Sequence, residues 1–382
     1  MQNIATGKLL QHCMIQVLVA LTMIFLLLRL LVASYNFFTA TRLARKPVNS
    51  QVNVSILIPA RNEEANIGKL LESICEQMEY IVEVLVLDDH STDRTKAIVE
   101  RYASKHPKVR VLTGLHLPEG WTGKNYACHQ LGREAKGEYL LFLDADIIIS
   151  AQSINSAVAR MQAKKLSLLS LFCNQQTYTL GEKLTVPLMN YLLLTLLPLP
   201  LIEKHPDPIF SAACGQFMMF TAASYHRHEW HKQAKNLVTE DLAIMKMVKQ
   251  QGEKGEGLLS GSLIHCRMYS GFSQAVVGFS KNIITPFNDS PLLFLTFLVL
   301  VIVGPIAVAS TANVYLISMT VAMILVTRYL TGEISGESTW QVLLHPLQMV
   351  SLVYIGINAV YCHLSKSAEW KGRKVTIANL EI

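Results

Sequence analysis

Residues 139–146 read Tyr-Leu-Leu-Phe-Leu-Asp-Ala-Asp, an apolar run that ends abruptly in two carboxylates. Such a continuous apolar run is typical of a strand that is buried on both faces. In an extended segment the side chains of residues i and i+2, here Asp144 and Asp146, point the same way. Two carboxylates held together repel each other unless a cation joins them, so the pattern indicates a divalent metal that bridges a diphosphate. The alternative is a solvated strand end.

Two earlier apolar runs end in polar clusters in the same way. Val54–Ile58 is closed by Pro59-Ala60-Arg61-Asn62-Glu63-Glu64, and Val82–Leu87 is closed by Asp88-Asp89-His90-Ser91-Thr92-Asp93. Each cluster taken alone also fits the start of a helix, where acidic residues face the positive helix end or a Ser or Thr provides the cap. A binding role for them therefore depends on whether the clusters meet in the fold.

Strand and helix patterns alternate along this part of the chain. Apolar residues recur at helical spacing after the first run, at Ile67, Leu70, Leu71, Ile74 and Met78. Further helices are expected at 93–103 (with Ser91 or Thr92 as cap), 125–136 and 153–163, and further strands at 109–112 and near 166–172. The alternation predicts an α/β fold with a mostly parallel sheet flanked by helices. Such sheets bind ligands at the carboxyl ends of their strands, where the acidic clusters stand.

A fourth acidic cluster, Thr239-Glu240-Asp241, opens a predicted helix that runs to about Gln251. A carboxylate at a helix start is often only a cap, and that interpretation stays open for this cluster in isolation.

The composition places part of the chain in a membrane. Of the 382 residues, 51% are hydrophobic and 16% are charged, against a usual charged share of about 25%. This excludes a disordered, collagen-like or coiled-coil chain and argues against a purely soluble protein. The net charge of +6 is too small to indicate nucleic acid binding and fits an anionic lipid surface or substrate as well. The cysteines form no Cys-x-x-Cys pair, which predicts a reducing compartment without a disulfide framework or zinc site.

Apolar segments lie at both ends of the chain. Residues 14–33 are long enough to span a membrane, with Arg29 near enough to one end to reach its surface. A cleaved signal peptide is the alternative, but Arg42, Arg45 and Lys46 follow the apolar run, which favours an anchor and places the next domain in the cytoplasm. Further apolar stretches stand at 291–310, 312–330 and 346–363.

The predicted spans create a conflict. One early and three late crossings put both chain ends outside if the middle of the chain is cytoplasmic, yet the tail carries Lys366, Lys371, Arg373 and Lys374. Either one late segment is interfacial or the tail violates the positive-inside rule. Residues 184–202 are also apolar, but their three prolines favour an interfacial or re-entrant segment over a regular span. The expected domains are an anchor at 1–44, a cytoplasmic domain at 45–288 and membrane helices with a basic tail at 289–382.

Taken together, the four acidic clusters resemble the family-2, inverting glycosyltransferases with a GT-A nucleotide-sugar fold. The elements PARNEE (59–64), LVLDDHSTD (85–93), FLDAD (142–146) and TED (239–241) follow in the family's order, and the likeness covers roughly residues 52–285. Further elements resemble the membrane branch found in carotenoid and hopanoid gene neighbourhoods: Gly120-Trp121-Thr122-Gly123-Lys124-Asn125, Cys214-Gly215-Gln216-Phe217, Gly278-Phe279-Ser280-Lys281-Asn282 and Trp370-Lys371-Gly372-Arg373.

The resemblance implies a role for each matching residue. The uridine of the nucleotide sugar would be held by Pro59, Ala60, Arg61, Glu63 and one of Asp88 and Asp89. Lys124 would approach the diphosphate or ribose, Asp144 would contact the ribose or sugar, and Glu240 would belong to the same donor site. Asp146, with Asp144 beside it, would ligate Mg²⁺ or Mn²⁺, and Asp241 would be the general base.

The implied activity is transfer of one sugar from a nucleotide sugar, with UDP-glucose the expected donor, to a lipid in the cell membrane. A carotenoid or other isoprenoid is the first acceptor expected, and polyprenyl phosphate, hopanoid and glycerolipid are alternatives. The chain lacks the Gln-x-x-Arg-Trp element of processive members, which only Gln274 and Lys281 approximate, and has His228-Glu229-Trp230 where Gly-Gly is usual. A non-catalytic nucleotide-sugar-binding protein is a second hypothesis. A transporter is disfavoured because we expect no paired charges in the spans, with Arg29 alone.

Overall fold

The computed structural model describes residues 2–39, 42–46, 53–365, 368–370 and 373–375, and the chain divides into two compact units. Unit 1 combines the segments 1–39, 178–198 and 271–364. Unit 2 combines 40–177, 199–270 and the segment from 365 onward. All seven cysteines are free thiols.

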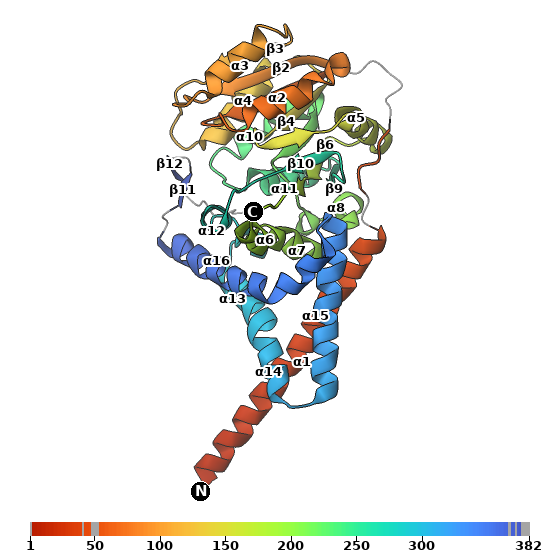
Figure 1. The fold of residues 1–382 in the computed structure, drawn as a ribbon, viewed down its shortest axis with the longest axis vertical. Coiled ribbons are helices and arrows are strands. Elements are labelled where there is room, and N and C mark those ends of the chain that lie inside the picture. The colour runs from red at the N-terminus through yellow and green to blue at the C-terminus, as the bar shows by residue number, and fades with distance from the viewer. Residues whose placement is uncertain (1, 40–41, 47–52, 366–367, 371–372, 376–382) are drawn as a thin grey trace. The chain divides into compact units, whose positions relative to one another are not determined.

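Unit 2 is built on a seven-stranded sheet in the order β3-β2-β1-β4-β8-β6-β9 (Figure 1). Its strands are β1 (Val54–Ala60), β2 (Ile81–Asp88), β3 (Val109–Thr113), β4 (Tyr139–Leu143), β6 (Leu168–Phe172), β8 (Phe217–Thr221) and β9 (Gly255–Leu259). Only β8 runs antiparallel to its neighbours, so the predicted mostly parallel sheet is confirmed. A small second sheet joins β5 (Ile147–Ile149), β10 (Ile264–Cys266) and β7 (Asn174–Gln175), and β11 (Ala368–Trp370) pairs with β12 (Arg373–Val375).

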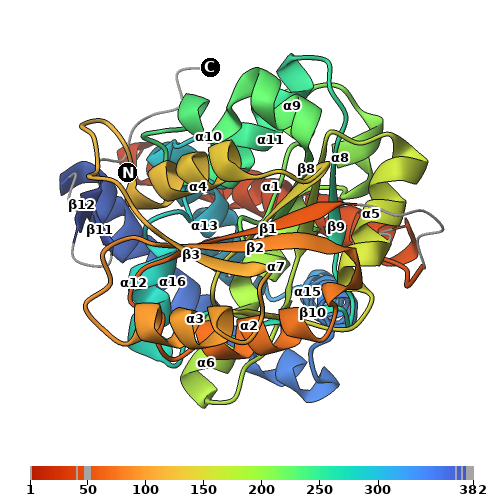
Figure 2. The same ribbon diagram turned by 90° about the horizontal axis from the view of Figure 1, so that it is seen from above.

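Helices cover both faces of the large sheet, as a parallel sheet with apolar strands requires. Figure 2 shows α4 on one face of β1–β3 and α2 and α3 on the other. The helices of unit 2 are α2 (Ile67–Cys75), α3 (Thr95–Ala103), α4 (Gly123–Glu134), α5 (Ser153–Lys164), α8 (Pro200–Lys204), α9 (Ala222–His228), α10 (Trp230–Gln233) and α11 (Glu240–Gln250), with short 3₁₀ turns at Met78–Tyr80 and Pro208–Phe210. The apolar stripe predicted for α2 is fully buried at Ile67, Leu70, Leu71 and Ile74.

Two local predictions were wrong. Helix α3 begins at Thr95 without a Ser91 or Thr92 cap, and Asp93 instead accepts a hydrogen bond from the Thr95 amide at 2.9 Å. Asp144 and Asp146 do not share an extended segment, because the chain turns between them as it passes from β4 in one sheet to β5 in the other.

The antiparallel strand β8 has a consequence for the edge of the sheet. Leu143 at the carboxyl end of β4 pairs with Phe217 at the amino end of β8. The loop before β8 therefore meets the loop after β4, and the Asp144 amide donates to the Gln216 carbonyl oxygen at 3.1 Å.

Unit 1 is almost entirely helical. Its helices are α1 (Gln2–Thr39), α6 (Leu180–Thr185), α7 (Pro187–Leu196), α12 (Phe272–Phe279), α13 (Pro291–Leu298), α14 (Gly304–Ser310), α15 (Val314–Ser335) and α16 (His345–Ser365). A π-helical turn at Val299–Val303 joins α13 to α14, and 3₁₀ turns stand at Thr285–Phe287 and Thr339–Leu344.

Four helical segments in the described part of the chain are long and apolar enough to cross a membrane: Gln11–Thr39, Pro291–Ser310, Val314–Ser335 and Thr339–Ser365. They correspond to the four predicted stretches. The Pro-rich stretch 184–202 is instead divided among α6, α7 and α8 by breaks next to its prolines, and the ten residues of α7 are too few to span a bilayer.

Two expectations about charge in unit 1 were wrong. Arg29 does not reach the surface but is 2% exposed; its guanidinium donates to Thr195 Oγ1 at 2.7 Å and lies 4.6 Å from the Tyr191 ring centroid. Arg29 is also not alone, because α15 holds the buried Arg328, which forms an ion pair with Glu337 just after that helix. Packing against neighbouring helices offers both arginines partners that a reading of isolated spans does not reveal.

Candidate active site

The loops that follow β1 and β2 are joined by polar contacts at the carboxyl end of the sheet. The Asp89 amide donates to the Ala60 carbonyl oxygen at 2.8 Å, and Arg61 Nη1 donates to the Asp89 carbonyl oxygen at 2.7 Å. Arg61 Nη1 also lies 3.8 Å from Asp89 Oδ2. The Glu63 amide donates to Thr95 Oγ1 at 2.7 Å. The first two predicted clusters thus form one surface, and Pro59 and Ala60 are the last residues of β1 within it.

Asp88 and Asp89 differ in their surroundings. Asp89 is engaged by Arg61, whereas Asp88 Oδ1 is buried and has no hydrogen-bond partner among the described residues. A buried acceptor without a partner is costly unless a ligand or water satisfies it. Asp88 is therefore the better placed of the two carboxylates to accept a hydrogen bond from a ligand.

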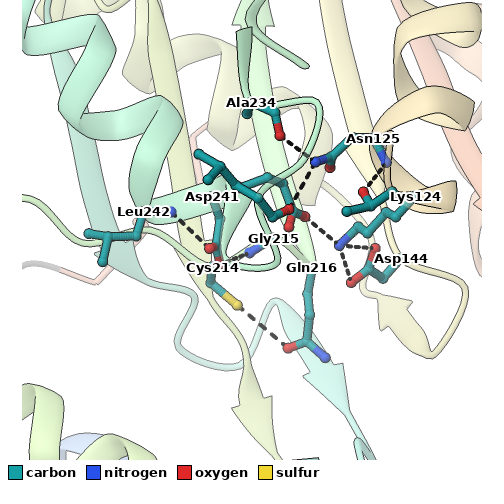
Figure 3. A network of polar contacts seen from close by, with 12 residues as sticks. Lys124, Asn125, Asp144, Cys214, Gly215, Gln216, Ala234, Asp241 and Leu242 are labelled. Atoms are coloured by element: carbon teal, nitrogen blue, oxygen red, sulfur yellow. Dashed lines mark hydrogen bonds and ion pairs between the residues drawn. The ribbon is translucent and has the colours of Figure 1, made fainter. Parts of the chain in front are cut away.

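Lys124 connects the third and fourth clusters (Figure 3). It follows Gly123 at the start of α4, a helix that Thr122 caps by accepting from the Asn125 amide. Its Nζ lies 2.9 Å from Asp144 Oδ1 and 3.0 Å from Glu240 Oε1. Asn125 Nδ2 donates to the Ala234 carbonyl oxygen at 2.6 Å, which ties α4 to the segment before α11.

Asp241 is held by backbone amides on both oxygens. The Gly215 amide donates to Oδ2 and the Leu242 amide to Oδ1, each at 2.8 Å (Figure 3). One amide comes from the loop before β8 and the other from the first turn of α11. The carboxylate is consequently fixed in position while its charge remains available to a reacting proton.

Burial perturbs the titration of the whole cluster. Burial would lower the pKa of Lys124, but Asp144 and Glu240 outweigh it and hold that pKa well above its usual range. Burial raises the pKa of Glu240 to about 7 despite the opposing effect of Lys124. It also raises the pKa of Asp241, against the effects of Lys124 and the two amides. Perturbed carboxylates clustered around one cation are typical of functional sites.

The surroundings of Asp146 fit a divalent cation. Burial and the nearby charges of Asp144 and Glu63 raise its pKa to about 7, and its Oδ1 is buried without a hydrogen-bond partner among the described residues. Gln216 Nε2 lies 3.5 Å from Oδ2. No group of three or more His, Cys, Asp or Glu side chains in the described part of the chain could hold a metal alone. The unpartnered Oδ1 of Asp146, with the Asp144 charge nearby, fits Mg²⁺, which takes one or two carboxylates and completes its coordination with water and phosphate oxygens.

The structure thus brings together Lys124, Asp144, Glu240 and Asp241 directly, with Asp146 reached through Gln216. Sequence reasoning missed the positioning roles of Gly215 and Gln216, although they stand in the quoted Cys-Gly-Gln-Phe element. The signal available was a glycine and an amide directly before a buried strand. Gln274 and Lys281, the approximate matches to the processive element, belong to unit 1.

The family model described as Glycosyl transferase family 2 matches residues 55–227. That range contains the loops after β1, β2 and β4, together with Lys124 and Gly215. Residues 55–227 are a family-2 glycosyltransferase domain. The protein is accordingly a glycosyltransferase, as the four clusters predicted.

Two relatives carry a more specific name. The chain is 24% identical to the 4,4'-diaponeurosporenoate glycosyltransferase of Staphylococcus haemolyticus over 347 residues, which cover 85% of this chain and 89% of that protein. It is 27% identical over the same length to the protein of that name from Staphylococcus aureus strain MRSA252, covering 85% and 88%. Both alignments extend well beyond the 173 residues of the range 55–227.

A solved structure confirms the fold. The mannosyltransferase PcManGT from Pyrobaculum calidifontis, in complex with GDP-Man and Mn²⁺, superposes with a TM-score of 0.58 at 16% identity, covering 92% of this chain and 98% of that one. The predicted GT-A fold with apolar helices at both ends is therefore present in this glycosyltransferase.

Proposed function

We propose that the protein transfers one sugar, with inversion, from UDP-glucose to a carotenoid or another isoprenoid dissolved in the cell membrane. The observation that carries the proposal is Asp241, a carboxylate fixed by two amides beside the Lys124–Asp144–Glu240 cluster. The names of the two relatives and the apolar helices of unit 1 support a lipid acceptor.

In this proposal the nucleotide lies over the joined loops after β1 and β2. The uridine is held by Pro59, Ala60, Arg61, Glu63 and Asp88. Asp88 accepts a hydrogen bond from the base or ribose through its unsatisfied Oδ1, while Asp89 fixes Arg61. Asp144 contacts the ribose or sugar, and Glu240 holds Lys124 from its other side.

Asp146 and Asp144 would hold Mg²⁺ or Mn²⁺ in this proposal. The bound ion would supply positive charge beside the leaving diphosphate. Lys124 adds its own charge, because an ammonium has three donors and approaches phosphate as a point charge. Asp144 and Glu240 keep that ammonium protonated, which suits it to an anionic leaving group.

The bond changes follow from these positions. The acceptor oxygen attacks the anomeric carbon, the bond to the diphosphate oxygen breaks, and UDP carries the electron pair away. Asp241 takes the proton of an acceptor hydroxyl as the new bond forms. Single displacement inverts the anomeric carbon, so an α-linked donor gives a β-glycoside. A carboxylate acceptor has no proton to lose and would leave Asp241 a smaller role.

We place the catalytic domain, residues 45–288, on the cytoplasmic side, because Arg42, Arg45 and Lys46 follow the first apolar helix. Residues 1–44 then form the anchor and residues 289–382 the remaining membrane helices and basic tail.

The proposal is tested with membranes that contain the full chain, incubated with labelled UDP-glucose and a panel of isoprenoid alcohols, carotenoid carboxylates, hopanoids, polyprenyl phosphates and glycerolipids. We expect one β-linked glucose on the isoprenoid or carotenoid, identified by mass spectrometry and by NMR of the anomeric proton. Transfer to none of these, with UDP bound, would favour a non-catalytic nucleotide-sugar-binding protein. An α-linked product would overturn the inverting mechanism.

A further inference from the structure

The division into units limits how often the chain can cross a membrane. Residue 270 ends one segment of unit 2, and strands β11 and β12 belong to the same unit. A compact sheet domain lies on one side of a bilayer, since its loops and edges cannot be satisfied within lipid. The chain between Ser270 and β11 therefore leaves that side and returns to it, so its number of crossings is even. Three candidate spans lie in this interval, so at least one of them does not cross.

Helix α16 differs from the other two candidates. Within its most apolar window 44% of the residues are buried inside the protein, against 28% for each of the two preceding candidates. Its buried face is polar at His345, Gln348 and Ser351. Gln348 donates to the Lys183 carbonyl oxygen at 2.9 Å and accepts from Arg328 Nε at 3.1 Å. Gln348 thus ties this face of α16 to α6 and α15 of the same unit, through Lys183 and Arg328.

The opposite face of α16 is apolar and exposed. It carries Leu347, Val350, Tyr354, Ile357, Tyr361 and Leu364, each more than half exposed. The alternating spacing of three and four residues places these side chains on one side of the helix. At 1.5 Å per residue the stripe is about 26 Å long. An apolar stripe of this length on a helix whose other face is bound to protein is suited to lie on lipid.

The direction and the aromatic content of α16 agree with this position. Figure 1 shows α16 running across the direction of α15, within the same unit. Its exposed stripe includes two tyrosines, and Trp340, which is 50% exposed, stands in the 3₁₀ turn before it. Tyrosine and tryptophan are enriched where the headgroups meet the acyl chains.

We propose that α16 lies in the plane of the bilayer interface, with its apolar stripe on the acyl chains, and that the chain crosses the membrane three times. The crossings are α1, the α13–α14 segment and α15. Residues after α16 then return to the side of unit 2. The basic tail, with Lys366, Lys371, Arg373 and Lys374, joins Arg42, Arg45 and Lys46 on one side, in agreement with the positive-inside rule. This arrangement holds whatever the donor and acceptor are.

Depth measurements on α16 test the proposal. In the full chain, the four cysteines that are not buried (Cys13, Cys75, Cys214 and Cys362) are replaced by serine. Single variants L347C, I357C and L364C are labelled with a fluorophore in phosphatidylethanolamine–phosphatidylglycerol vesicles, and V321C on the exposed side of α15 is the control. Lipids carry a spin label near the headgroup or near the chain end.

We expect the headgroup-proximal label to quench all three α16 positions equally, whereas V321C responds more to the chain-end label. A deep Ile357 position flanked by shallow Leu347 and Leu364 positions would show a crossing helix and overturn the proposal. Absence of quenching at all three positions would show that protein, such as a second copy, covers the stripe, and would also overturn it.

Sidedness is tested separately with a membrane-impermeant maleimide on R45C, on A312C and on a cysteine added after Ile382. We expect the first and last to react from the same side and A312C from the opposite side. Reaction of the added cysteine from the side of A312C would restore four crossings and refute the arrangement.

Discussion

At the scale of single residues, the proposed chemistry depends on how Asp241 is held. Replacing Asp241 with Asn keeps the size of the side chain but removes the carboxylate that we propose as the base. We expect UDP binding to stay within about threefold and kcat with a hydroxyl acceptor to fall by at least about a hundredfold. Isothermal titration with UDP and initial-rate kinetics measure the two quantities. Retention of most of the turnover would remove Asp241 from its role.

The pH dependence of the transfer rate provides a second test of the same role for Asp241. Because burial raises the pKa of Asp241, the group is protonated at a higher pH than an ordinary aspartate and cannot then accept a proton. The rate with a hydroxyl acceptor is therefore retained above this raised pKa and lost as the pH falls through it. A carboxylate acceptor needs no base, so the rate of transfer to that acceptor should not depend on the protonation of Asp241.

Gly215 occupies a position where even a methyl group would disturb the catalytic side chains. A Cβ there would lie 3.1 Å from Lys124 Nζ, 3.3 Å from Glu240 Oε1 and 3.5 Å from Asp241 Oδ2. These flexible side-chain ends can move by a few tenths of an ångström, so Gly215→Ala should fold normally but lose roughly tenfold in kcat. Gly68→Ala is the matched control, because its nearest neighbour is 3.7 Å away. Equal kinetics for the two variants would show that this close approach has no catalytic value.

Asp146 is the residue through which we propose that the site depends on a divalent metal. Chelation should stop transfer, and added Mg²⁺ or Mn²⁺ should restore it, because clustered carboxylates need a cation before a diphosphate can approach. Asp146→Ala should weaken metal-dependent UDP binding by at least about tenfold, measured by titration with and without metal. Full activity in excess chelator would contradict this prediction.

At the scale of elements, the sequence pattern predicts the strands better than it predicts the contacts between the loops that follow them. Strand β4 coincides with the apolar part of the run 139–146, because a wholly apolar run between polar residues allows little else. The antiparallel placement of β8 was not predictable, since Phe217–Thr221 has the same apolar pattern as a parallel strand. That placement brings Gly215 and Gln216 to the site, which explains why sequence reasoning found the charged groups but missed the loop that aligns them.

The same limit applies to the membrane helices. Their existence follows from length and apolarity, but the burial of Arg29 and the pairing of Arg328 depend on which helices meet. The partners of polar residues inside an apolar stretch therefore become known only with the tertiary structure.

Helix α7 supports a prediction about the acceptor. Its buried Leu194 and Thr195 bond to Asn36 and Arg29 of α1, while Leu196 is 36% exposed. If apolar surface on α7 receives the lipid, Leu196→Gln should raise the KM for the lipid about threefold or more and leave that for UDP-sugar unchanged. Val82→Gln, at the same exposure on β2, is the matched control. Unchanged lipid kinetics would assign α7 to anchoring alone.

At the scale of the whole molecule, the proposed function combines membrane attachment with the transfer of a single sugar. Unit 1 commits about a third of the chain to apolar helices, which a water-soluble acceptor would not require. The sequence also lacks the Gln-x-x-Arg-Trp element that processive members of the family carry. Both features agree with the proposed function, in which a lipid is modified once and released into the bilayer.

We therefore expect a monoglycoside as the end product, even with a large excess of donor and long incubation. A product that carries one sugar moves its hydroxyls into the headgroup region, away from the position that the first acceptor group occupied, because the sugar is strongly hydrated. Mass spectrometry of the extracted lipids over a time course measures the number of sugars on each acceptor. The monoglycoside prepared chemically should fail as an acceptor while the free lipid reacts in the same vesicles. A ladder of products with two or more sugars, or elongation of a soluble oligosaccharide, would refute single transfer.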